Sequence, residues 1–256
     1  MPRVVPSKDV PDMAVVGKPE VKVDAVRLVK GNPAFTDDLK KEVNSSQSAS
    51  ESSRSRKHHD IDDTKTVALP GVHAVIHYKN TPRVKYASGG KAGLTPTRRP
   101  SKFDNKVRHV GDRVAAVAAE TKEIAQVALD LIKVEYEILP YVLDEIETME
   151  PDSPVIHDEA DTEEIYDADR NIVLRIEAER GDVEKGAIEA DHVFEDTFKV
   201  HQVQQVPIEP HISVAWLDSD ERLVVRTATQ VPFHVRRMLA PLIGRDIKDV
   251  RASSRE

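Results

Sequence analysis

The most regular pattern of apolar and polar positions lies between residues 107 and 139. Arg113–Ala119 contains almost only valine and alanine, which is typical of a strand covered on both faces. Thr121 then stands where a helix N-cap is needed, and residues 133–139 (KVEYEIL) alternate with the two-residue period of a second strand. Between them, apolar residues recur on one helical face: Ile124, Val127, Ala128 and Leu131. The order strand, helix, strand predicts a βαβ unit whose two parallel strands are joined by a right-handed crossover.

Two segments without apolar rhythm are predicted to be disordered loops. Residues 44–59 (NSSQSASESSRSRKHH) hold seven serines and one apolar residue, so burial of side chains cannot offset the entropy cost of ordering them. Residues 87–102 are rich in Gly, Pro, Thr and Arg. Between these segments, residues 72–78 (VHAVIHY) follow the turn pair Pro70-Gly71 and have the apolar character of a buried strand.

The second half of the chain predicts further strands and a final helix. Residues 171–179 and 192–200 alternate like strands, and Asp182 can cap a short helix between them. Residues 212–217 and 222–229 are two strands joined by a polar turn, which predicts a hairpin.

The last predicted helix starts at Pro232, where the missing N–H of the first turn costs nothing. Its apolar stripe consists of Val235, Met238, Leu239 and Leu242, and Gly244 can end it. The acidic segment 151–170 carries two prolines, so we interpret it as a linker between two domains, residues 1–150 and 171–256.

Composition excludes several classes of protein. The chain carries 37 Lys and Arg against 45 Asp and Glu, a net charge of −8, so it lacks the basic field that attracts nucleic acid. With no cysteine it forms neither disulfides nor cysteine-ligated iron–sulfur clusters. Apolar runs such as 114–119 are too short to span a bilayer, and the start lacks the apolar core of a secretory signal. We expect a soluble, cytoplasmic protein that binds neither nucleic acid nor membrane.

Candidate chemistry is scarce, and the residues leave alternatives open. A cluster of His and Asp has ligand types suited to zinc, but a solvated charged loop explains it better: His58, His59, Asp60, Asp62 and Asp63. Gln230 lies between the end of a predicted strand and the N-terminus of the following helix, a position that favours ligand binding. A residue that only forms the turn or caps the helix would explain Gln230 equally well. A polar cluster precedes it and reads either as a strand end or as part of the same pocket: Gln202, Gln204, Gln205, Glu209 and His211.

These residues resemble the molybdenum-binding subunit of the xanthine dehydrogenase and aldehyde oxidase family. The opening carries part of the likeness, in residues 16–19 (VGKP), Asp24-Ala25 and Lys30-Gly31. The rest lies in five segments: 69–76 (LPGVHAVI), 103–121 (FDNKVRHVGDRVAAVAAET), 181–193 (GDVEKGAIEADHV), 207–211 (PIEPH) and 229–232 (TQVP). Within the family, the sequence most resembles subunits that act on aromatic acyl-CoA compounds, such as 4-hydroxybenzoyl-CoA reductase. The resemblance implies a mixed α/β chain, with an α/β hammerhead domain followed by the start of a molybdopterin-binding domain.

The same resemblance implies a molybdenum-molybdopterin cofactor, with the amide of Gln230 near the molybdenum oxo group. It further implies a small aromatic, heterocyclic or aldehyde substrate, and electron transfer to iron–sulfur and FAD subunits or domains. No catalytic residue and no direct metal ligand is assigned in this chain.

Three segments depart from the family pattern: 39–60, 92–101 and 252–256. In the family, most cofactor contacts and the glutamate that acts as general base come later in the chain. We therefore expect an N-terminal fragment that is inactive alone. The alternative is a non-catalytic hammerhead-type module for binding or assembly, and sequencing the region downstream would separate the two.

Overall fold

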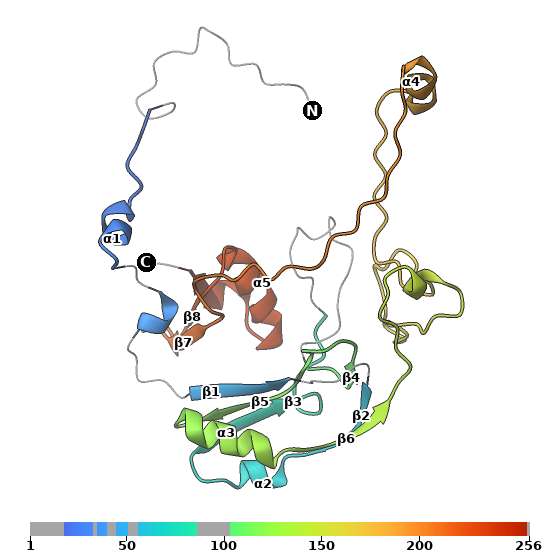
Figure 1. Cartoon of the computed structure of the whole chain (residues 1–256). Helices are drawn as coiled ribbons and strands as arrows, with labels where there is room; N and C mark the ends of the chain where they lie inside the picture. Colours follow the sequence, from blue (N-terminus) through green and yellow to red (C-terminus); the bar gives the residue numbers. More distant parts are fainter. Residues whose placement is uncertain (1–17, 33–34, 40–44, 51–55, 86–102, 255–256) are drawn as a thin grey trace.

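The computed structural model describes residues 18–32, 35–39, 45–50, 56–85 and 103–254. Two sheets and their helices form one unit between residues 45 and 138, and a third sheet with a long helix forms a second unit near the carboxyl terminus (Figure 1). Between the units the chain runs out and back along an extended excursion, residues 173–208, which we call the arm (Figure 1). Short helical turns lie outside the units: α1 (Ala25–Val29), η1 (Thr36–Asp38) and η2 (Glu147–Met149).

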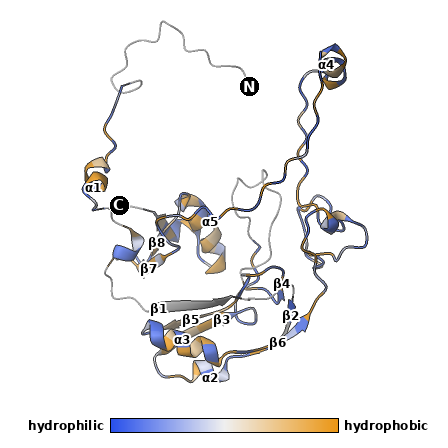
Figure 2. Cartoon of the chain, in the orientation of Figure 1, coloured by the Kyte–Doolittle hydropathy of each residue, from blue (hydrophilic) through white to orange (hydrophobic). Residues whose placement is uncertain are grey.

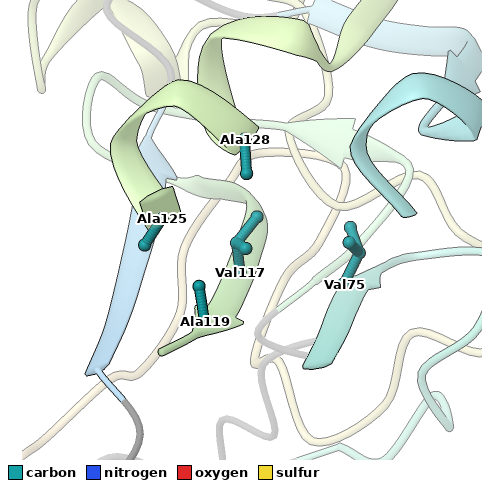
Figure 3. Packing of buried hydrophobic residues seen from close by; sticks show 5 residues of the cluster. All are labelled: Val75, Val117, Ala119, Ala125 and Ala128. Atoms are coloured by element: carbon teal, nitrogen blue, oxygen red, sulfur yellow. The ribbon is translucent and has the colours of Figure 1, made fainter. Parts of the chain in front are cut away.

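The first sheet has the order β1-β5-β3 and is antiparallel throughout. Its central strand is β5, whose small apolar side chains are buried as its composition predicts. Figure 3 shows Ala125 and Ala128 of the neighbouring helix facing Val117 and Ala119 of β5. Alanine at these contacts lets the helix lie close to the sheet. The elements are β1 (Ser45–Ser50), β3 (Val72–His77), β5 (Arg113–Ala119), α2 (Thr64–Val67) and α3 (Lys122–Leu131).

Helix α3 begins where the sequence predicts. The Thr121 Oγ1 atom accepts a hydrogen bond from the N–H of Ile124 at 3.2 Å, which confirms the N-cap. The fully buried Thr66 of α2 donates its hydroxyl to the carbonyl of Ala128 at 3.1 Å. Together these bonds fix α3 at both its start and its middle.

The second sheet shows that the predicted parallel pair is wrong. Its order is β4-β2-β6, with β4 (Lys106–Val107), β2 (Arg56–Asp62) and β6 (Lys133–Ile138) all antiparallel. Strands β5 and β6 therefore flank α3 in sequence but lie in different sheets. Both edges of β5 are taken by β1 and β3, so no edge remains for β6.

The predicted loop over residues 44–59 is also wrong wherever the structure describes it. Ser45–Ser50 pairs with β5, and Arg56–Asp62 pairs with β4 and β6. Strand pairing uses backbone N–H and C=O groups, so an open sheet edge can order a segment whose sequence lacks an apolar pattern. The second predicted loop, residues 87–102, lies outside the described residues.

In the arm, the predicted helix is present but the two predicted strands are not. Its helix α4 (Val183–Glu189) is present, and the Asp182 carboxylate accepts from the N–H of Lys185 at 2.9 Å, as predicted. The strands predicted at residues 171–179 and 192–200 are not formed: both segments are extended without ladder pairing, apart from one isolated bridge between Asp167 and Ile172. Their alternating sequence has no neighbouring strand in the described part of the chain.

The third sheet has the order β7-β8-β9. Its first two strands form the predicted antiparallel hairpin, and β8 pairs in parallel with β9 across helix α5. Within the described residues, a parallel strand-helix-strand unit thus forms from Leu223 to Ser253 and not at the predicted residues 113–139. The elements are β7 (Ser213–Leu217), β8 (Leu223–Thr227), α5 (Pro232–Leu242), η3 (Ile247–Asp249) and β9 (Val250–Ser253).

Candidate cofactor site

Gln230 lies in the four-residue connection between β8 and α5, and its side chain is exposed. The connection is held by the Thr229 Oγ1 atom, which accepts from the N–H of Val231 at 3.1 Å. Thr227 at the end of β8 donates its hydroxyl to the carbonyl of Ile212 at 3.1 Å and lies 2.6 Å from the Ser213 hydroxyl. Because Thr227 already donates its hydroxyl proton to Ile212, the Ser213 hydroxyl is the donor in the bond between Ser213 and Thr227. The strand end that presents Gln230 is therefore fixed to β7.

A second strand reaches the same edge. Arg226 of β8 pairs in register with Ser253 of β9, and the two strands run parallel, so their carboxyl ends lie together. Gln230 and Ser254 each follow one of these ends. In open α/β sheets, ligands bind outside the carboxyl ends of parallel strands. The sequence predicted the connection from β8 to α5. It did not predict β9, because the four residues of this strand (VRAS) show no periodic pattern of apolar positions.

Helix α5 aims its N-terminus at this edge. Pro232 occupies the first turn and Gly244 follows the helix with φ of +64°, as the sequence predicts. The guanidinium of Arg236 donates to the carbonyl of Ile247 at 2.8 Å, and Ala240 is fully buried, so the helix is held against η3 and β9. The positive end of its dipole consequently lies beside Gln230.

The polar cluster that precedes Gln230 in sequence does not gather around it. Gln202, Gln204 and Gln205 lie exposed on the arm. Glu209 accepts a hydrogen bond from the backbone N–H of the buried Thr36 at 3.0 Å, and so ties the base of the arm to η1. His58 and His59, which the sequence analysis weighed as zinc ligands or as part of a solvated loop, belong to strand β2. In the part of the chain that is described, no group of three or more His, Asp or Glu side chains could hold a metal ion directly.

A separate charged cluster joins residues 104–108 to residues 158–159, and we call it the ionic clamp. The Arg108 guanidinium donates to Asp104 at 2.7 Å and to Glu159, while Lys106 pairs with Asp158 at 2.6 Å. Burial opposes ionisation of both Arg108 and Glu159. Hydrogen bonds from His157 and Arg108 nevertheless hold the pKa of Glu159 far below its usual range, and the pKa of Arg108 is raised.

The ionic clamp borders a cavity of about 250 Å³, which is lined by apolar residues of the segments 139–142 and 154–156. Its two cations already face three carboxylates, so the clamp leaves no surplus positive charge for an anionic ligand. The pairs of the clamp join residues that are 51 and 52 positions apart in the chain, which indicates a structural role. The predicted linker 151–170 is thus anchored to the first unit by these ion pairs, and the domain boundaries themselves stay a prediction.

Two family models match this chain. The model of the aldehyde oxidase and xanthine dehydrogenase a/b hammerhead domain matches residues 30–140, and the model of the molybdopterin cofactor-binding domain matches residues 165–256. The chain belongs to the xanthine dehydrogenase and aldehyde oxidase family. Its first unit is therefore a hammerhead domain, and the third sheet with α5 belongs to a molybdopterin-binding domain.

Relatives in the family are longer than this chain. The probable hypoxanthine oxidase XdhD of Escherichia coli (strain K12) is 37% identical over 91% of this chain and 27% of its own length. The nicotinate dehydrogenase large molybdopterin subunit of Eubacterium barkeri is 31% identical over 94% of this chain and 53% of its own length. Quinoline 2-oxidoreductase from Pseudomonas putida 86 superposes with a TM-score of 0.74 at 25% identity, over 91% of this chain and 29% of that one.

The chemistry of the edge at Gln230 fits an oxo- or phosphate-bearing group of the kind a molybdopterin cofactor carries. The amide side chain is exposed, uncharged, and able both to donate and to accept hydrogen bonds. The adjoining N-terminus of α5 favours negative charge. These features make up one wall of such a site.

The likeness to 4-hydroxybenzoyl-CoA reductase stays a prediction, as does the role of Gln230. No helix in the described part is long and apolar enough to cross a bilayer.

Proposed function

We propose that this chain forms the part of the molybdenum-binding subunit of a hydroxylase-type oxidoreductase that carries the hammerhead domain and a portion of the molybdopterin-binding domain. The substrates we propose are aromatic, heterocyclic or aldehyde compounds, since the relatives include an enzyme named for hypoxanthine and one named for nicotinate. The observation that carries the proposal is the position of Gln230. It stands at the carboxyl edge of β8 and β9, within the region that matches the molybdopterin-binding family model.

In this proposal Gln230 binds the molybdenum-molybdopterin cofactor through its side-chain amide. When bound, the cofactor supplies the oxygen-atom and two-electron chemistry. The rigid end of β8 and the start of α5 hold the amide in place, and the helix dipole stabilises negative charge beside it. We further propose that the electrons pass to iron–sulfur and FAD partners, which fits a chain without cysteine.

The isolated chain should bind the cofactor poorly, because one wall of a pocket buries only part of a ligand. A chimera tests the function: this chain replaces the matched segment of E. coli XdhD, and the product is purified with its redox partners. We expect the chimera to hold molybdenum and to oxidise a purine or N-heterocycle. A chimera that folds but holds no molybdenum would instead favour the non-catalytic hammerhead-type module.

The role of Gln230 is tested in the same chimera. Gln230→Ala should lower turnover by about 10- to 100-fold, because it removes a hydrogen bond to the reacting group while the exposed side chain contributes little to packing. The control is Gln126→Ala, an exposed amide on α3 that hydrogen-bonds Asp130 at 3.2 Å. Equal turnover of the Gln230→Ala and Gln126→Ala chimeras would remove the assignment.

A further inference from the structure

The cavity of about 250 Å³ beside the ionic clamp lies between the end of the hammerhead domain and the segment that follows it. Figure 2 shows hydrophobic colour along the chain just after β6, where one of its walls begins. The apolar residues that line the cavity are Leu139, Pro140, Tyr141, Val142, Pro154, Val155 and Ile156, and the charged ones are Lys106, Arg108 and Asp158. Small-molecule sites in proteins have this composition, with apolar walls and a few polar groups.

The wall formed by residues 154–156 is held by two side chains. The Oδ1 atom of Asn171 accepts from the N–H of Ile156 at 2.8 Å, and its Nδ2 atom donates to the carbonyl of Pro154 at 3.1 Å. The ammonium of Lys106 donates to the carbonyl of Ile156 at 2.9 Å. Because these bonds fix the wall before a ligand enters, binding costs little conformational entropy.

The apolar side chains of the cavity are partly buried. Leu139, Val142, Val155 and Ile156 each keep a portion of their surface open, and Tyr141 is 46% exposed. Residues that line an open cavity have this intermediate burial, since one side packs against the protein and the other is free. An apolar cavity of roughly 150 Å³ is large enough for benzene, so this cavity has room for one substituted ring.

The charges beside the cavity disfavour an anionic ligand. Lys106 already pairs with Asp158 at 2.6 Å, and Arg108 pairs with Asp104 at 2.7 Å and with Glu159. Two cations therefore face three carboxylates, so an anion would meet a net negative charge. A cation would have to compete with Lys106 and Arg108 for the same carboxylates. A neutral ligand meets neither penalty.

The same two cations favour an aromatic ring over an aliphatic one. The side chains of Lys106 and Arg108 line the cavity and are each only 11% exposed. A cation against the face of an aromatic ring is attracted by its π electrons, and more strongly where both are desolvated. Tyr141 adds a ring that can pack against the face or edge of another ring. A saturated ring of equal size gains neither interaction.

We propose that this cavity binds a small, neutral aromatic molecule. The ring of the ligand lies between the walls 139–142 and 154–156, in contact with Tyr141 and with the cations of the ionic clamp. The site shares no residue with the edge at Gln230. The proposal is therefore independent of the cofactor role proposed for Gln230, and its test is read from binding alone.

The experiment titrates the full chain with three ligands of similar size: benzamide, its saturated analogue cyclohexanecarboxamide, and the anion benzoate. Binding is read from the methyl resonances of Val142, Val155 and Ile156 in NMR spectra, with those of Val127 on α3 as the reference. We expect saturable shifts with benzamide and a Kd on the order of 1 mM, as suits a ligand of so few atoms. Cyclohexanecarboxamide should bind about 5-fold more weakly, and benzoate about 10-fold or more.

Two variants locate the bound ligand. Val155→Trp fills the cavity and should weaken the binding of benzamide by about 10-fold or more. The matched control is Val127→Trp, at a position of α3 that is 52% exposed, which should bind benzamide like the parent chain. Tyr141→Ala removes a ring from the cavity without adding volume and should weaken binding by about 3- to 10-fold. Circular dichroism checks each fold, and Tyr141→Ala carries the test if Val155→Trp does not fold.

Three results would overturn the proposal. One is the absence of saturable shifts with benzamide at concentrations up to about 20 mM. Another is benzoate binding as tightly as benzamide, since the clamp would then present surplus positive charge. The last is unchanged affinity in folded Val155→Trp or Tyr141→Ala chains, which would place the ligand elsewhere. A folded XdhD chimera without molybdenum would contradict the proposed function and leave this site intact.

Discussion

The guanidinium of Arg108 donates to the carboxylate of Glu159, which lies 51 residues later in the chain. Their side chains are 11% and 16% exposed, and Asp104, at 9%, completes the group. This contact, with the Lys106–Asp158 pair beside it, fastens the acidic segment after β6 to the hammerhead domain. The direction in which the chain leaves the hammerhead domain is thereby set by a largely buried ion pair.

Removing the cation of the ionic clamp should destabilise the chain. Arg108→Met removes the cation that the largely buried Asp104 and Glu159 share, although Asp104 keeps Arg83 at 3.8 Å and Glu159 keeps His157 and Thr162 nearby. We expect a loss of about 3 kcal/mol in the free energy of unfolding. Urea denaturation followed by circular dichroism measures it. The control is Lys185→Met in the exposed Lys185–Glu189 pair of α4, which should change stability by less than about 0.5 kcal/mol. Equal losses in the two variants would contradict the structural role of the clamp.

The clamp also predicts a pH dependence of stability. The pKa of Glu159 is lower in the folded chain than its usual value near 4.5, so its contribution is complete above that pH. As the pH falls below 4.5, the unfolded state takes up the proton first and this contribution is lost. Glu159→Gln should therefore flatten the decline in urea midpoint with acidification, whereas Glu189→Gln should follow the parent curve. Parallel curves for all three chains would show that Glu159 does not titrate as described.

Gly71 is required for both its backbone angle and its close packing. Its φ is +84°, its carbonyl accepts from the N–H of Glu120 at 2.9 Å, and a Cβ there would lie 2.8 Å from the Cδ1 atom of Ile124. We expect Gly71→Ala to cost about 1–3 kcal/mol in thermal or urea unfolding. Gly181 has a φ of +83° with open space around it, so Gly181→Ala carries only the backbone strain. A Gly71→Ala chain as stable as Gly181→Ala would mean that the contact with Ile124 relaxes freely.

The alanines between α3 and β5 set the distance between helix and sheet. Ala128 is fully buried against Val117 and Ala119 (Figure 3). Ala128→Leu should overpack this contact and lower the free energy of unfolding by about 1–3 kcal/mol, as urea denaturation would measure. Val127→Leu, at a half-exposed position on the same helix, is the control and should be nearly neutral. Unchanged stability in Ala128→Leu would mean that the interface is loosely packed.

Local signals predicted local structure well. Thr121 and Asp182 cap their helices, Pro232 starts α5, and the turn between β7 and β8 closes a hairpin. Each of these features depends on residues within a few positions of one another, so a single stretch of sequence contains the cause.

Pairing between distant strands was not predictable from pattern. The serines of β1 carry no apolar rhythm, yet the strand forms because β5 offers it a hydrogen-bonding edge more than 60 residues away. The same limit hid β9, and with it the second strand of the edge at Gln230. Conversely, residues 192–200 have a strand pattern but no partner within the described residues. The backbone of a strand is satisfied only by a neighbour, and sequence pattern does not name the neighbour.

The most direct test of the central claim is the molybdenum content of the purified proteins, measured by inductively coupled plasma mass spectrometry. We predict no stoichiometric molybdenum in the isolated 256-residue chain, because it supplies one wall of the site, and about one molybdenum per chain in the XdhD chimera. A stoichiometric metal in the isolated chain, or its absence from a folded chimera, would contradict the account.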